Sequence, residues 1–80
     1  MRVTYSFTMQ AVCPVDKKND AYEVQVISDR TIPVERILEL TKDQPEGFQE
    51  DLTENLARLL GARVISTGWH SGVKTVCEAG

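Results

Sequence analysis

The first third of the chain alternates between apolar and polar positions. From residue 2 to residue 12 the apolar side chains fall on one face, and these are Val3, Tyr5, Phe7, Met9 and Ala11. Residues 21–28 repeat the pattern, with Tyr22, Val24 and Val26 on the apolar face. A period of two residues is typical of a half-buried β-strand. The pattern therefore predicts two strands joined by a loop.

The middle of the chain changes to helical spacing. A short amphipathic helix is predicted over 33–42, because Pro33 suits a first helical turn and apolar residues follow at helical intervals. A second helix is predicted from Phe48 to Leu60, and Gly61 suits the left-handed residue that ends it. The apolar stripe of this second helix consists of Phe48, Leu52, Leu56, Leu59 and Leu60.

The last third returns to strands, at 62–70 and at 73–78, and Ser71-Gly72 suits a tight turn between them. Val64, Ile65 and Trp69 are all core-type residues, so the pattern does not assign the faces of the third strand. The order strand, strand, helix, helix, strand, strand predicts an α+β domain, in which two helices cover one face of an antiparallel sheet. Its edge strands would be free to pair with neighbouring subunits.

Length, composition and charge indicate which classes of partner the protein can have. The 80 residues form one domain, 1–80, and so short a chain is expected to gain stability from oligomerisation. The net charge is −3 and only Lys17 and Lys18 are adjacent basic residues, which argues against a nucleic-acid surface. The sequence has no apolar run long enough to predict a membrane-spanning helix. Two cysteines suggest a reducing setting, the cytoplasm.

The loop between the first two strands carries the most chemistry. Cys13 ends the first strand before Pro14, and Asp20 opens the second. Because the two ends of a hairpin loop lie close together, a thiol nucleophile is expected beside a proton donor or acceptor. Lys17 and Lys18 between them would favour the thiolate. The alternative is a buried, inert cysteine with a turn-forming aspartate and two solvated lysines.

Other polar residues have plainer explanations when taken alone. Glu50 lies in the first turn of the second helix, where a carboxylate favours the helix dipole. His70 is expected to be solvated or capped, and no second histidine or acidic cluster at ligand spacing predicts a metal site. Cys77 is interpreted as a small core residue, and nothing in the sequence demands a Cys13–Cys77 disulfide.

The order of elements resembles the T-fold (tunnelling fold), whose members assemble their sheets into barrels and bind purine- or pterin-like rings between subunits. Cys13-Pro14, five residues and then Asp20 is similar to the active-site signature of the 7-cyano-7-deazaguanine reductases, the nitrile reductases of queuosine biosynthesis. Phe48-Gln49-Glu50-Asp51 resembles that family's Phe-His-Glu-Asp at the start of the second helix. The resemblance runs from Met9 to about Gly72.

The resemblance implies an oxidoreductase in which Cys13 attacks a nitrile to form a thioimide and Asp20 handles protons. It also implies that the substrate-binding residues are Glu50, Glu35, Phe48 and Gln49. NADPH would then reduce the thioimide to an aminomethyl base. The implied partners are a small purine-like base and further copies of the chain, in a barrel such as a decamer with sites between subunits.

Two departures keep other functions open. Gln49 replaces the family's His, and the first helix reads Val34-Glu35-Arg36-Ile37 where the reductases carry a Glu-Ser-Lys-Ser-type motif tied to NADPH binding. Glu35 matches that motif's Glu, but the Ser-Lys pair is missing. The archaeosine amidinotransferases, which keep the Cys and Asp without the NADPH motif, are also similar to this chain. The alternatives are therefore ammonia addition to a nitrile in tRNA, which the acidic charge disfavours, or a non-catalytic purine- or pterin-binding T-fold module.

Overall fold

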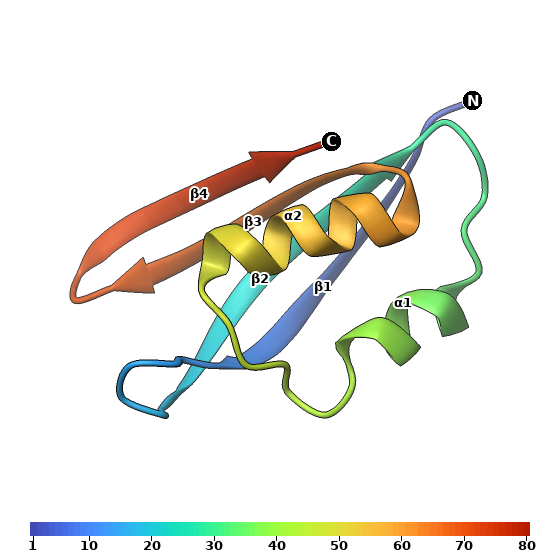
Figure 1. The fold of residues 1–80 in the computed structure, drawn as a ribbon. Coiled ribbons are helices and arrows are strands. Elements are labelled where there is room, and N and C mark those ends of the chain that lie inside the picture. Colours follow the sequence, from blue (N-terminus) through green and yellow to red (C-terminus); the bar gives the residue numbers. More distant parts are fainter.

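Six elements follow one another in the predicted order in the computed structural model, which describes residues 1–80 (Figure 1). The elements are β1 (Val3–Val12), β2 (Asn19–Ser28), α1 (Val34–Thr41), α2 (Gln49–Leu60), β3 (Arg63–His70) and β4 (Val73–Ala79). Each differs from its predicted range by one or two residues, as is usual at element ends. No helix has the length and apolar character needed to cross a membrane.

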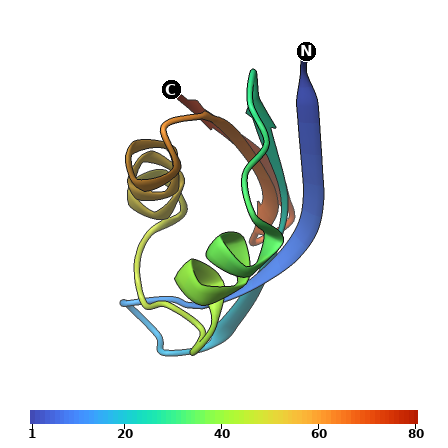
Figure 2. The same ribbon diagram turned by 90° about the vertical axis from the view of Figure 1, so that its right-hand side faces the viewer.

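The four strands form one antiparallel sheet in the order β1-β2-β3-β4. Both helices lie on the same side of this curved sheet, and the other side carries none (Figure 2). The predicted α+β architecture, ββααββ with two helices on one face, is therefore confirmed. Strand β1 and strand β4 are the two edges, and neither has a second strand partner within the chain.

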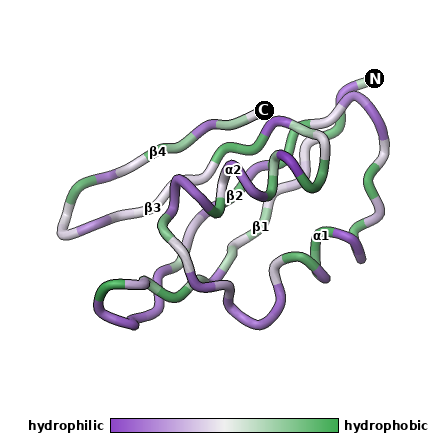
Figure 3. Tube along the Cα trace, in the orientation of Figure 1, coloured by the Kyte–Doolittle hydropathy of each residue, from purple (hydrophilic) through white to green (hydrophobic).

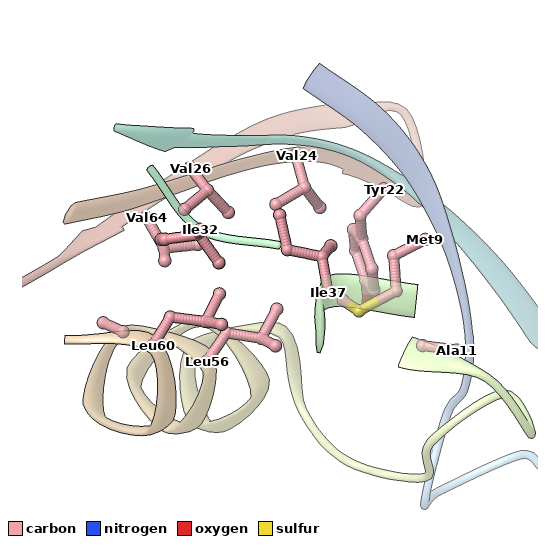
Figure 4. Close-up of a cluster of buried hydrophobic side chains, with 11 residues drawn as sticks. Met9, Ala11, Tyr22, Val24, Val26, Ile32, Ile37, Leu56, Leu60 and Val64 are labelled. Carbon is pink, nitrogen blue, oxygen red and sulfur yellow. The ribbon is translucent and has the colours of Figure 1, made fainter. Parts of the chain in front are cut away.

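The core lies between the sheet and the helices. Figure 4 shows Leu56 and Leu60 pointing from α2 toward Val26 and Val64 on the sheet, while Ile37 approaches the sheet from α1. All five side chains are at most 5% exposed, so the apolar area removed from water here is a main source of stability. Hydrophilic residues concentrate instead in the segment between α1 and α2 (Figure 3).

The structure shows which residues of β3 face the helices, a point that the sequence pattern did not decide. Val64 is fully buried on the helix-covered face, whereas Ile65 and Trp69 lie on the uncovered face, where Trp69 is 64% exposed. The alternation of β3 is therefore regular, but its inward residues after Val64 are the small Ser66 and Gly68. Large outward residues hid this pattern in the sequence.

The ends of the elements follow the predicted turn chemistry. Gly61 adopts the left-handed conformation, with φ of 59°, and ends α2. Ser71 and Gly72 both have positive φ, 51° and 83°, as the tightest hairpin turns require. The Arg30 guanidinium adds a contact that the sequence did not indicate, because it donates to the carbonyls of Leu60 and Gly61 at 2.9 and 3.3 Å. These bonds satisfy carbonyls left unpaired at the helix end.

Gly68 is required by a close approach rather than by its backbone angles. A Cβ atom at this position would overlap the ring of Tyr22 on the neighbouring strand. We expect Gly68→Ala to lower the free energy of unfolding by about 1–3 kcal/mol, because the buried Tyr22 ring cannot move aside. Gly47→Ala is the matched control, since its methyl group would meet only the movable side chain of Leu52, at 3.0 Å. Denaturant unfolding of both variants measures the difference, and equal losses would contradict this explanation.

Candidate active site

A cavity of about 270 Å³ opens where the β1–β2 loop, the start of α2 and the β3–β4 hairpin meet. Its walls consist of Cys13, Pro14, Asp20, Tyr22, Gly47, Phe48, Gln49, Glu50, His70 and Thr75. Five of the six predicted site residues therefore lie around one space, although they come from two distant parts of the sequence. The sixth, Glu35, is exposed on α1 and does not line this cavity.

The β1–β2 hairpin sets the positions of Cys13 and Asp20. Asp20 pairs with Ala11 across the two strands, which places its side chain on the helix-covered face. The loop closes tightly, because the Cys13 N–H donates to the Lys18 carbonyl and the Lys17 N–H donates to the Cys13 carbonyl, both at 2.9 Å. Cys13 and Asp20, from the two ends of the loop, line the same cavity.

Asp16 is a neighbour of the thiol that sequence reasoning missed. A backbone hydrogen bond from Lys18 lowers the pKa of the Asp16 carboxyl, and a hydrogen bond from the Cys13 side chain lowers it further, against an opposing effect of desolvation. The missed signal was the Asp-x-Lys spacing within the loop, which is typical of an aspartate that accepts a backbone N–H two residues on. An exposed carboxylate therefore accompanies the thiol on the loop itself.

A short parallel contact joins the end of β1 to the segment before α2. The Val12 N–H donates to the Pro45 carbonyl at 3.0 Å, and the Gly47 N–H donates to the Val12 carbonyl at 3.1 Å. An exposed ion pair between Lys17 and Glu46, at 3.1 Å, adds little stability in water. The backbone contact brings the start of α2 beside Cys13.

Gln49 forms the floor of the cavity and is only 2% exposed. Its Nε2 donates to the carbonyls of Ser66 and Thr75 at 3.2 and 3.0 Å, and lies 3.1 Å from the Ser66 hydroxyl. Thr53 extends this network, with its hydroxyl 2.7 Å from that of Ser66. The helix start is therefore fixed to β3 and β4 by buried, fully paired polar groups.

Tyr22 is the second residue that sequence reasoning did not place in the site, because its position in the apolar face of β2 indicated only a core role. The ring is buried, and the hydroxyl donates to the Asp20 carboxyl at 3.5 Å. Burial raises the pKa of Tyr22 to about 12, with further contributions from Asp20, Cys13 and Glu50. All three groups are thus close enough to Tyr22 to affect its charge.

His70 is exposed, as expected for a solvated histidine, and it also lines the cavity, where its Nε2 lies 2.8 Å from the Gln49 Oε1. Cys77 is half-buried on β4, where burial and then the Glu50 carboxylate raise the pKa of its thiol, against a bond with Ser66. Both cysteines are free thiols. No three His, Cys, Asp or Glu side chains converge closely enough to hold a metal ion.

The strands and helices around this cavity form an α+β, T-fold-like architecture. One similar solved structure is the crystal structure of the archaeosine synthase QueF-Like in the apo form. The two folds agree with a TM-score of 0.80 over 98% of this chain and 90% of the other, at 20% sequence identity. At that identity the likeness shows the fold. No known family profile matches the sequence, and no curated protein matches it.

The raised pKa of Tyr22 gives a testable pH dependence. The hydroxyl keeps its proton in the folded protein up to about pH 12, whereas its ordinary pKa is 10.0. Below pH 10.0 the Tyr22 hydroxyl keeps its proton in both the folded and the unfolded protein, so it costs no stability. As the pH rises from 10.0 toward 12 the unfolded protein loses this proton first, and the free energy of unfolding falls. We expect the loss to be about 2–3 kcal/mol in the wild type and absent in Tyr22→Phe. Denaturant unfolding across this range tests it, and parallel pH profiles for the two proteins would contradict it.

Proposed function

We propose that the cavity captures the nitrile group of a 7-cyano-7-deazaguanine base as a covalent thioimide on Cys13. The observation that carries this proposal is the meeting of Cys13, Asp20 and Glu50 around one cavity, as lining residues from two distant segments. A thiol, a carboxyl group and a second carboxylate are the nucleophile, the proton donor and the base-recognition group that such a capture needs. The resemblance of the Cys-Pro and Phe-x-Glu-Asp motifs adds to it.

In the proposed first step, the Cys13 thiolate attacks the nitrile carbon and a carbon–sulfur bond forms. One π-electron pair of the carbon–nitrogen triple bond moves to the nitrogen, which takes the proton of the Asp20 carboxyl. The Tyr22 hydroxyl, 3.5 Å from that carboxyl, holds it at the cavity wall. Covalent capture divides a difficult addition into two easier steps.

Recognition of the base falls to the start of α2. Glu50 would accept hydrogen bonds from the N–H edge of the deazaguanine, and the half-exposed Phe48 would pack on its ring. Gln49 would contribute shape only, because its amide already bonds to the protein on both sides. A role for Glu35 would require a second copy of the chain, since Glu35 lies outside its own cavity.

For the second step we propose attack by ammonia, which releases an amidine. The missing Ser-Lys pair supports this, because Ile37 stands at the position of the motif's Lys and is 3% exposed in the core. The neighbouring cation, Arg36, is exposed and lines a different cavity, which it shares with Arg30, whose guanidinium is bonded to the end of α2. The lysine that the motif ties to NADPH binding therefore has no counterpart at its own position, and no hydride step is proposed here. The fold shared with an archaeosine synthase agrees with amidine formation.

The net charge of −3 favours a free base over one carried in tRNA as the substrate. The reductive reaction on a free base therefore stays the second candidate. Incubation of the captured adduct with either NADPH or ammonia separates the two reactions by product mass. Incubation with a nitrile-containing tRNA tests the other form of the substrate.

The first test is the intact mass of the protein after incubation with 7-cyano-7-deazaguanine alone. We expect an adduct equal to the mass of the base, because thioimide formation retains every atom of both partners. Cys13→Ala should give none, and Cys77→Ala, which removes the other free thiol, should react like the wild type. If no adduct forms while Cys13 still reacts with a general thiol reagent, the chain is a binding module and the proposal fails.

Glu50 supports a second test of the same site. Glu50→Gln replaces a charged hydrogen-bond acceptor, so we expect adduct formation at low base concentration to slow by roughly 10–100-fold. Glu54→Gln is the matched control, since Glu54 is exposed on the same helix but does not line the cavity. Equal rates for the two variants would remove Glu50 from base recognition and leave the role of Cys13 intact.

A further inference from the structure

We propose that His70 is the base that removes a proton from the nucleophile attacking the thioimide, with Gln49 as its orienting partner. This inference rests on the proposed function and assigns a residue to its second step. His70 is the single histidine of the chain, and it lines the same cavity as Cys13 and Asp20. The β3–β4 hairpin therefore supplies a third wall with acid–base chemistry.

The hydrogen bonds of Gln49 determine which ring nitrogen carries the proton. The Gln49 Nε2 is a donor to the carbonyls of Ser66 and Thr75, which fixes the orientation of the buried amide. Its Oε1 then faces the His70 Nε2 at 2.8 Å and can only accept. The neutral ring must therefore carry its proton on Nε2. Nδ1 is left unprotonated and free to act as a base.

This arrangement also suits the charged ring that forms after proton transfer. When Nδ1 takes a proton, the Nε2–H···Oε1 bond remains and becomes charge-assisted, so it strengthens. Gln49 is held by two carbonyls from β3 and β4, and the amide does not need to rotate. A nucleophile, a base and a third group that orients the base are the recurring parts of covalent catalysis.

The position of His70 separates it from the first step. Tyr22 is the neighbour of both groups: its hydroxyl bonds to Asp20 at 3.5 Å, and its ring centre lies 5.9 Å from that of His70. Asp20 thus serves the nitrile nitrogen from β2, while His70 approaches from β3. Two proton-handling groups on different strands allow the two steps to use different residues.

Ammonia attacks the thioimide carbon, a carbon–nitrogen bond forms, and the π pair moves to the imide nitrogen, which takes a proton from solvent. The proton on the attacking nitrogen passes to His70 Nδ1. The carbon–sulfur bond then breaks with its electron pair on the Cys13 sulfur, and the amidine leaves as the cation. His70 returns its proton to that sulfur, so one nitrile, one ammonia and one solvent proton give one amidinium ion.

The test starts from protein already carrying the Cys13 adduct and follows its decay after ammonia is added. We expect His70→Ala, once it carries the adduct, to lose it roughly 100–10,000-fold more slowly than the wild type does, the usual contribution of a general base. Added imidazole should restore part of the rate. His70→Gln is the matched variant, because its amide N–H can still donate to Gln49 but carries no base; it should be as slow as His70→Ala.

The outcomes separate the two proposals. If the adduct forms and His70→Gln releases it at the wild-type rate, His70 is structural, and this inference is overturned while thioimide capture stands. If the wild type forms no adduct, the proposed function fails and the inference with it. Nuclear magnetic resonance of the imidazole nitrogens gives a readout that needs no substrate. A neutral ring protonated at Nδ1 instead of Nε2 would overturn the inference even if capture is observed.

Discussion

The buried amide of Gln49 is the constraint on which the candidate site depends. Its nitrogen bonds to backbone carbonyls on β3 and β4, and its oxygen bonds to His70. An unpaired amide at 2% exposure would cost several kcal/mol, so these partners favour the observed position of the start of α2. The flanking residues Phe48 and Glu50 are carried to the cavity wall as a result. Gln49, which was expected to bind substrate, therefore fixes the position of the residues that line the cavity.

The sequence was most informative about elements and least informative about contacts across them. Alternation in β1 and β2 predicted the strands, and the short loop predicted that Cys13 and Asp20 would be neighbours, because hairpin pairing is local. It could not show that Gln49 and His70 bond to one another, since that contact joins a helix start to the end of a strand. Tyr22 was interpreted as a core residue because the core residues and the cavity-lining residues of β2 lie on the same face of the strand. Trp69 was ambiguous for the opposite reason, as the inward residues beside it are small.

The fold of this protein and its proposed chemistry are supported by different observations. The likeness to the archaeosine synthase covers almost the whole chain but retains one residue in five, so it fixes the path of the backbone and not the roles of side chains. The proposed chemistry is supported by the cavity itself, which Cys13, Asp20, Tyr22 and Glu50 line together. His70 extends that set beyond the residues that motifs indicate, whereas Asp16 lies on the loop and does not line the cavity. The first helix shows the converse, because Glu35 matches a motif but lies outside the cavity.

The parallel contact between Val12 and the Pro45–Gly47 segment has a consequence for how the chain folds. Each hairpin brings together residues that are near in sequence, so it closes with a small loss of chain entropy. The contact at Val12 encloses the whole of β2 and α1 in one loop, and the entropy lost on closure grows with loop length. The hairpin bearing Cys13 therefore closes at a smaller cost in chain entropy than the contact that brings the helix bearing Glu50 beside it. Non-local contacts of this kind slow folding, and they assemble the cavity only as the domain itself forms.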